Sequence, residues 1–283
     1  MRTNILLLVA TTLLSLLSLS AGAQNTAWPA PNKPITFINP FPPGGAVDAF
    51  GRPLAKQLSA QLNDSILVDN RGGAGGTLGA AVAAKMAPDG YTWFLGAVHH
   101  SIAPSMYPNL SYDITKDFEP IAIIGSVPHV IVVNPTKFPK NDLKSIMEAI
   151  RKNPGKYNYA STGNGTSQHL AGELFKMQNK LFITHIPYRG AAAAVTDVMA
   201  GQVPVMISAL SVVLPHIRAG KLKVLGVASK TRSPLLPNVP TINESVKGYE
   251  FSTWGALLAP KGTSPAMIEK LNESLATALK DPK

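Results

Sequence analysis

The hydrophobic pattern near the start of the chain predicts a strand, a tight turn and a helix, in that order. A short apolar run begins at Ile35, breaks at Pro42-Pro43-Gly44-Gly45 and resumes with helical spacing as far as Leu58. Glycines in such a turn allow the backbone to approach a ligand, and the first turn of a helix has N–H groups without intrahelical partners. A carboxylate or phosphate fits such a site. A single Gly-Gly pair is equally compatible with a turn that satisfies only its own backbone.

The same unit recurs in the next part of the chain. Residues 65–70 are predicted as a strand, residues 71–77 as a second glycine loop and residues 78–86 as a helix of small residues. A third strand is expected at residues 91–98, with His99-His100-Ser101 at its end. Strands that alternate with helices indicate a parallel sheet covered on both faces.

A second group of elements follows an extended apolar stretch at residues 120–134, which is long enough to cross between two lobes. Residues 143–151 are predicted as a helix because apolar side chains recur there at steps of three and four residues. These side chains are Leu143, Ile146, Met147 and Ile150. Strand–loop–helix units then repeat, with strands at 157–160 and 182–187, loops at 161–167 and 188–190, and helices at 168–178 and 191–200.

The last part of the chain is expected to return to the first lobe. Residues 203–208 are a further predicted strand, and residues 221–229 are again extended and apolar, so we expect them to be the return crossing. A strand at 251–258 precedes a helix with Pro265 in its first turn. Ile268, Leu271, Leu275 and Leu279 lie on one face of that helix.

The sequence therefore predicts an α/β protein with two lobes, parallel-rich sheets and two crossover connections. Residues 24–125 and 226–283 are assigned to lobe 1, and residues 126–225 to lobe 2. Two crossings between the lobes provide a hinge.

The N-terminus predicts export. Residues 1–23 have a basic start, an almost uninterrupted apolar run and a small-residue ending, as in a cleaved signal peptide. The run is shorter than the ~20 apolar residues that a membrane-spanning helix needs. With no cysteine there is neither a lipidation site nor a disulfide framework. We expect a soluble periplasmic protein that begins near Gln24.

The charge of the chain changes this picture little. The formal net charge is +10 and the sequence pI is about 9.7. The basic residues are scattered, however, without aromatic interleaving or a recognisable nucleic-acid module. No nucleic-acid partner is predicted, and a cationic surface that attracts anionic solutes is favoured.

Catalytic motifs are weakly represented. No serine lies in a G-x-S-x-G elbow, no phosphate loop ends in Gly-Lys-Ser/Thr, and no H-E-x-x-H motif occurs. The Gly73–Gly79 loop is a loose relative of the dinucleotide fingerprint, but export argues against a nicotinamide cofactor. His99 and His100, if on a strand, point to opposite faces, and Asp48 is expected to accept backbone N–H bonds in a first helical turn. We predict no catalytic residue, metal or cofactor.

The repeated loops are the positive evidence for a binding site. Loops at residues 42–46, 72–77, 162–166 and 188–191 all follow predicted strands and precede helices. They therefore lie at the carboxyl ends of strands, where open α/β sheets bind ligands. Because they belong to two lobes joined by a hinge, they can close on a small anion from both sides.

At these residues the chain resembles the Bug or TctC-type extracytoplasmic solute receptors of tripartite tricarboxylate transport systems, in order along most of its length. The similar segments are Pro40–Asp48, Val68–Gly76, Ala87–Thr92, Asp117–Ile121, Pro187–Gly190, Asp197, Gly201–Val203, Arg232–Pro234 and Val239–Thr241. The resemblance implies a type II periplasmic-binding-protein fold, a carboxylate ligand held by loops of both lobes, and integral-membrane transporter subunits as partners. Members usually continue beyond the position of Lys283, so we expect a truncated lobe 1.

The resemblance and the loops together predict the ligand-binding residues. These are Phe41, Gly44, Gly45, Ala46, Gly76, Thr77, His99, Ser161, Thr162, Gly163, Thr166, Tyr188, Gly190 and Ser208. Many members carry acidic residues where this chain has Pro204 and Ser208, so a ligand without an amine is favoured. Phe41, His99, Tyr188 and Trp254 offer flat walls for an aromatic carboxylate, and the same loops suit a dicarboxylate or tricarboxylate. The alternative function is an exported α/β enzyme, a reductase or hydrolase, acting on a small carboxylate.

Overall fold

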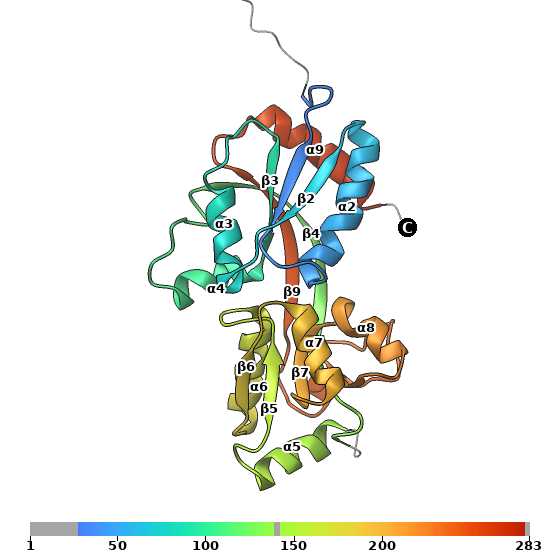
Figure 1. Cartoon of the computed structure of the whole chain (residues 1–283). Helices are drawn as coiled ribbons and strands as arrows, with labels where there is room; N and C mark the ends of the chain where they lie inside the picture. Colours follow the sequence, from blue (N-terminus) through green and yellow to red (C-terminus); the bar gives the residue numbers. More distant parts are fainter. Residues whose placement is uncertain (1–27, 139–141, 281–283) are drawn as a thin grey trace, which may run out of the picture.

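The protein has two lobes connected by two long strands (Figure 1). The computed structural model describes residues 28–138 and 142–280. The predicted signal segment, residues 1–23, lies outside the described residues. Lobe 1 is the upper part of Figure 1 and lobe 2 the lower part.

Lobe 1 is built on three neighbouring parallel strands. Its elements are β1 (Ile35–Asn39), α2 (Ala46–Leu62), β2 (Ile66–Asn70), η2 (Ala74–Gly76), α3 (Thr77–Ala83), β3 (Thr92–Ala97), α4 (Val98–Met106) and α9 (Pro265–Ala278). β1 lies between β2 and β3 and is parallel to both. Because side chains alternate along a strand, the sheet buries both faces. Phe37 of β1 packs in a cluster with α2 and α9, whereas Ile38 packs with α3.

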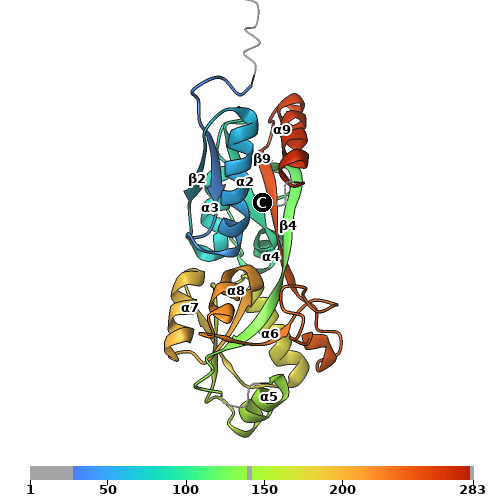
Figure 2. The ribbon, with the colours of Figure 1, turned by 90° about the vertical axis from the view of Figure 1, so that its right-hand side faces the viewer.

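Two antiparallel strands link the lobes. β4 (Phe118–Val133) pairs with β9 (Ser252–Pro260) from Phe118 to Pro128, and the two run side by side between the lobes (Figure 2). β9 also pairs with β3, and the lower half of β4 pairs with β7. The sheets are consequently mixed, because the predicted parallel strands are joined by antiparallel crossings.

Lobe 2 repeats the strand–helix alternation. Its elements are α5 (Leu143–Lys152), β5 (Asn158–Ser161), α6 (Ser167–Asn179), β6 (Thr184–Pro187), α7 (Ala191–Ala200), β7 (Val205–Ala209), α8 (Leu210–Arg218), β8 (Lys223–Val227) and η3 (Ile242–Glu244). β5 is parallel to both β6 and β7. α5 and α6 pack on the face that contains Ile131, and α7 and α8 pack on the face that contains Val130.

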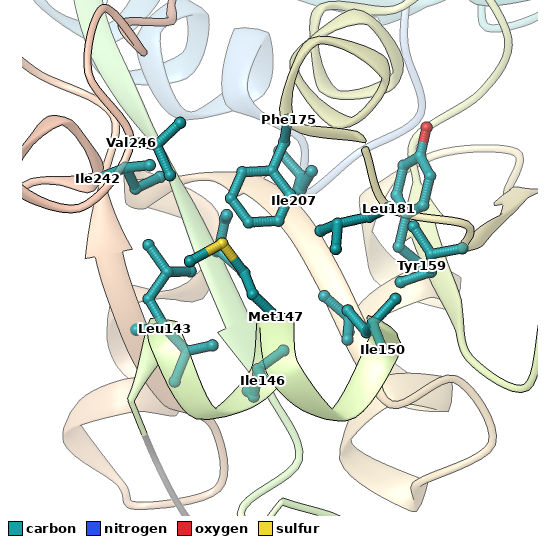
Figure 3. Close-up of a cluster of buried hydrophobic side chains, with 14 of the residues drawn as sticks. Leu143, Ile146, Met147, Ile150, Tyr159, Phe175, Leu181, Ile207, Ile242 and Val246 are labelled. Carbon is teal, nitrogen blue, oxygen red and sulfur yellow. The ribbon is translucent and has the colours of Figure 1, made fainter. Parts of the chain in front are cut away.

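The core of lobe 2 confirms the helix predicted from apolar spacing. The buried residues of α5 are Leu143, Ile146, Met147 and Ile150, and they pack against α6 and β7 (Figure 3). Asp142 caps this helix by accepting a hydrogen bond from the Ser145 N–H. Ile242 and Val246 complete the same cluster, so the chain after β8 remains in lobe 2.

The predicted return crossing at residues 221–229 is therefore wrong. This segment forms β8, which pairs with β4 at Val130–Val133 inside lobe 2. The return crossing is β9, since its pairing with β4 and β3 brings the chain back into lobe 1. An apolar extended run is common to any buried strand, and its pattern does not reveal which strand it pairs with.

α9 packs against α2 and closes one face of lobe 1. It begins at Pro265, as predicted, and buries Leu271, Leu275 and Ala278. Leu279, predicted on the same apolar face, follows the end of the helix and is about half exposed (49%).

Candidate functional site

The loop between β1 and α2 lines the cleft with glycine and apolar residues and contributes no polar side chain to it. Gly44 has a left-handed φ of +82°, which glycine adopts without strain, and Gly45 is the N-cap of α2 with an extended φ of −85°. The position that requires glycine for its conformation is therefore Gly44. Gly45 has no side-chain cap, and with Ala46 and Val47 it lines a small chamber between the lobes. The N–H groups of this first helical turn lack intrahelical partners.

Asp48 holds this loop in place, as the sequence predicts. Its carboxylate accepts hydrogen bonds from the Gly44 N–H (3.1 Å), the Asn39 amide (3.2 Å) and the Arg52 guanidinium (2.9 Å). Burial raises the pKa of Asp48, but the bonds from Arg52, Gly44 and Asn70 outweigh it and leave the pKa below its ordinary value. Asp48 is thus an ionised structural anchor.

The second glycine loop of lobe 1, residues 72–76, also lines the cleft. Gly73, Ala74, Gly75 and Gly76 all have positive φ. A Cβ on Gly76 would lie 2.8 Å from the Phe41 ring, so this close approach requires glycine. Thr77 Oγ1 donates to the Ala74 carbonyl (2.9 Å) and supports the loop from behind.

His99 and His100 lie in the first turn of α4, not at the end of a strand as predicted. β3 ends at Ala97, and both rings are buried. His100 is structural, because its Nδ1 contacts the Ala97 backbone and its Nε2 contacts the Gly76 carbonyl. His99 packs at 4.7 Å from the Phe41 ring and lines the small chamber.

Lobe 2 contributes polar side chains from the β5–α6 loop. Thr162 Oγ1 donates to Gln168 Oε1 (3.0 Å), and both residues line the small chamber. Thr166 is the N-cap of α6: its hydroxyl donates to the Gly163 carbonyl (2.7 Å) and accepts from the His169 N–H (3.4 Å). Ser161 is buried behind this loop and accepts from the Gly163 N–H.

The β6–α7 loop adds the last wall. Gly190, with φ +111°, is the N-cap of α7, and no side chain caps that helix. The Tyr188 hydroxyl donates to the Asp197 carboxylate (2.7 Å), so the ring is held at a fixed position. Burial, together with this carboxylate, raises the pKa of Tyr188 to about 12.

The loops of both lobes line two neighbouring spaces. We call the larger the outer cavity; it measures about 920 Å³ and lies between the second glycine loop of lobe 1 and the 162–164 and 187–190 loops of lobe 2. The smaller, the inner chamber, measures about 20 Å³. Phe41, Pro42, Thr162 and Gly190 line both spaces. At the rim, the Tyr107 hydroxyl donates to the Asn164 carbonyl across the cleft (3.0 Å).

Most of the predicted site residues meet at these spaces. Those that line one or both are Phe41, Gly45, Ala46, Gly76, His99, Thr162, Gly163, Tyr188 and Gly190. Gly44, Thr77, Ser161, Thr166 and Ser208 do not line either space and instead lie in or beneath the surrounding elements. Ser208 is buried in β7, where its hydroxyl contacts the Ala209 carbonyl (3.3 Å). Trp254 of β9 also lies outside the lining.

Several lining residues were not predicted from the sequence. The polar ones are Gln168 in the inner chamber and Asn70, Tyr107, Asn164 and Arg189 in the outer cavity. Gln168 is the second residue of α6, and its only signal in the sequence is its position directly after the polar loop. Arg189 stands inside the predicted Tyr188–Gly190 loop.

The inner chamber is electrically neutral. Among the described residues that line it, His99 alone is titratable. Burial, with the nearby His100 and His129, lowers the pKa of His99 to about 3, although a hydrogen bond with Gln168 opposes this. His99 is therefore uncharged at neutral pH, and the donors available to an anion are backbone N–H groups and neutral side chains.

Two serine–histidine contacts occur behind the site rather than in it. Ser161 Oγ lies 2.6 Å from His185 Nε2, and Ser167 Oγ lies 3.0 Å from His129 Nε2. Both serines are fully buried and line neither space. A substrate in the cleft does not reach either hydroxyl. Among the described residues, no three His, Asp or Glu side chains gather closely enough to hold a metal ion.

The chain is similar to known proteins over most of its length. Residues 50–283 match the family described as the tripartite tricarboxylate transporter family receptor. The protein BugT of Bordetella pertussis (strain Tohama I) is 40% identical over 254 residues, which are 88% of this chain and 77% of BugT.

Two solved structures are also similar. The periplasmic binding protein BugD is 37% identical with a TM-score of 0.85, over 89% of this chain and 84% of BugD. MatC of Rhodopseudomonas palustris, solved with bound malate, is 31% identical with a TM-score of 0.83, over 89% of this chain and 86% of MatC. These matches confirm the predicted two-lobed periplasmic-binding-protein fold.

Proposed function

Because this chain belongs to the tripartite tricarboxylate transporter receptor family, we propose that it captures a small carboxylate between its lobes and delivers it to membrane subunits of such a transporter. The observation that carries the proposal is the inner chamber, where the N-termini of α2 and α7 come from different lobes and line the same space. Helix N-termini stabilise anions through free N–H groups and the helix dipole.

In this proposal the ligand carboxylate accepts hydrogen bonds from the backbone N–H groups of Gly45 and Ala46 in lobe 1. Thr162 binds it from lobe 2, with Gln168 positioned by Thr162, and Gly163 lies next to Thr162 in the lining of the outer cavity. Thr166 serves the same site indirectly, because its hydroxyl is occupied in capping α6. Hydrogen bonds to an ionised group contribute roughly 1.5–3 kcal/mol each, so a neutral site of this kind binds an anion without a paired cation.

The ligand in the related MatC structure, malate, supports a carboxylate for this chain. The outer cavity has room for a much larger ligand than the inner chamber, so the part of the ligand beyond the carboxylate occupies the outer cavity. Its apolar walls include Phe41 and Tyr188, which suit a hydrocarbon or aromatic body.

A receptor is favoured over the alternative enzyme. The two serine–histidine contacts are closed off from the cleft, and Asp48 is fully engaged in holding its loop. For a reductase using the Gly73–Gly79 loop, the predicted export argues against a nicotinamide cofactor.

We place the protein in the periplasm, with residues 1–23 removed as a signal peptide. Among the described residues, none of the helices combines the length and apolar character needed to span a bilayer. N-terminal sequencing of exported material tests this, and recovery of intact Met1 in a membrane fraction would contradict it.

A thermal-shift screen of residues 24–283 tests the receptor function directly. The panel contains aliphatic and aromatic mono-, di- and tricarboxylates, and a ligand that binds only the folded state raises the melting temperature. The bound compound is then recovered after prolonged incubation. We expect it unchanged, and turnover of any carboxylate or ester would favour the enzyme.

A further inference from the structure

Arg189 is the one charged residue that lines the outer cavity among the described residues. The remaining lining residues are apolar, glycine or neutral polar, and no carboxylate lines either space. A single cation in an otherwise neutral cleft favours negatively charged groups on the ligand. It therefore bears on which carboxylates the protein binds.

Arg189 has no carboxylate ion-pair partner among the described residues, in contrast to three other arginines of the chain. Arg52, Arg71 and Arg232 each form an ion pair with an aspartate or glutamate at 2.8–2.9 Å. None of the ion pairs formed by residues 28–138 and 142–280 involves Arg189. Arg189 is an exposed residue, so a group that arrives from solution has access to it.

The position of Arg189 relates it to the inner chamber. It lies between Tyr188 and Gly190, and Gly190 lines both spaces and caps α7. Consecutive Cα atoms lie about 3.8 Å apart, so the Arg189 side chain begins close to the junction of the two spaces. A ligand anchored in the inner chamber extends past this junction into the outer cavity.

We propose that Arg189 binds a second anionic group of the ligand and thereby selects dicarboxylates over monocarboxylates of the same length. The inference rests on the proposed function, which places the first carboxylate in the inner chamber. A guanidinium matches a carboxylate with two parallel N–H bonds, and apolar walls such as Phe41 and Tyr188 reduce competition from water. The inner chamber thus selects ligands with a carboxylate, and Arg189 selects those with a second one.

The test measures binding of matched ligand pairs to wild type and Arg189→Gln. The pairs are adipate with hexanoate, glutarate with pentanoate, and terephthalate with 4-methylbenzoate, measured by calorimetry at one ionic strength. For the dicarboxylates that bind wild type, we expect Arg189→Gln to weaken binding tenfold or more. For the monocarboxylate of the same pair, we expect a change of less than twofold.

Arg218→Gln is the matched control, because it removes the same charge from an exposed position of α8 outside both spaces. It should change the affinity of neither ligand by more than twofold, and circular dichroism with urea unfolding checks that both variants fold. If Arg189→Gln weakens both members of a pair equally, or neither, the role of Arg189 is wrong while the receptor function stands. If wild type binds monocarboxylates only, the role of Arg189 is likewise wrong. If wild type binds no carboxylate in this panel or in the wider thermal-shift screen, the proposed function fails and this inference fails with it.

Discussion

The two lobes build their halves of the inner chamber from different materials. The lobe 1 loop at residues 42–47 lines the chamber with glycine and apolar residues, and the carboxylate of its polar anchor, Asp48, is hydrogen bonded to its own loop. The lobe 2 loop at residues 161–168 presents Thr162 and Gln168, which hydrogen bond to each other at the chamber wall. Under the proposed function, the lobe 1 loop therefore binds the carboxylate through backbone N–H groups and the lobe 2 loop binds it through side chains. Substitutions in the two loops should therefore weaken carboxylate binding for different physical reasons.

The largest expected effect comes from adding bulk to the lobe 1 loop. Gly45→Val should weaken carboxylate binding more than a hundredfold, because the side chain occupies space beside the N–H groups that we propose as the donors to the anion. The fold should survive, since a Cβ at Gly45 meets only the Pro42 carbonyl at 3.6 Å and the φ of −85° suits any residue. Calorimetry gives the affinity, and urea unfolding gives the stability.

Gly45→Ala serves as a graded control with an intermediate loss of affinity. Gly44 is unsuitable for this purpose, because its φ of +82° adds backbone strain to any substitution. Native affinity in Gly45→Val would show that the anion does not approach the start of α2.

The sequence predicted the local units of this fold well and their long-range pairing poorly. Apolar spacing identified the buried face of α5, and glycine turns located the loops of the cleft. The return crossing was placed at residues 221–229 rather than at β9, because strand pairing depends on residues distant in the sequence. The α4 helix was missed because Ala97 offers no capping side chain and Pro104 lies inside the helix.

The next largest effect should come from the chemistry of lobe 2. Thr162→Val removes the hydroxyl that lines the chamber and positions Gln168, with little change in side-chain volume. We expect about a tenfold loss of affinity, equivalent to about 1.4 kcal/mol. Thr162→Ser keeps the hydroxyl and should stay within threefold of wild type. Equal affinities for the Val and Ser variants would show that the hydroxyl of Thr162 does not contribute.

The site was predictable where backbone makes it and less so where side chains do. Glycine loops after strands are recognisable in the sequence, so Gly45, Gly76 and Gly190 were correctly predicted to lie at the cleft. Gln168 was missed because a glutamine in a predicted helix is typical of an exposed surface position. The sequence does not show which residues lie near it across the cleft. Thr166 was predicted as a ligand-binding residue but lines neither space, since a threonine before a helix signals a cap as readily as a ligand.

Thr166→Val separates capping from binding within the lobe 2 loop. The substitution removes the cap of α6 and should lower the free energy of unfolding by about 1 kcal/mol. Affinity should change less than threefold, because Thr166 does not line the chamber. Thr166→Ser retains the cap and is the matched control. A tenfold loss of affinity without loss of stability would return Thr166 to direct contact with the ligand.

The smallest expected effect is that of pH on affinity. His99 packs against the lobe 1 loop, and burial lowers its pKa to about 3. It therefore stays neutral between pH 5.5 and 8.5, where the ligand carboxylate is ionised. Affinity measured across this range at constant ionic strength should vary less than twofold. Binding that tightens on acidification with a midpoint near pH 6.5 would show that a histidinium holds the anion.

Stability should respond to the same change of pH, which provides an internal control. Burial lowers the pKa of His99 and His129 to about 3 and that of His100 to about 4, below the value of about 6.5 for an unfolded histidine. Between these values the unfolded chain binds more protons than the folded chain, so the free energy of unfolding decreases as pH falls below about 6.5. Each histidine contributes at most about 1.4 kcal/mol per pH unit. Urea unfolding at pH 7.5 and 5.5 measures this loss. A loss of stability at constant affinity would show that the buried histidines stabilise the fold around the chamber but contribute no positive charge to ligand binding.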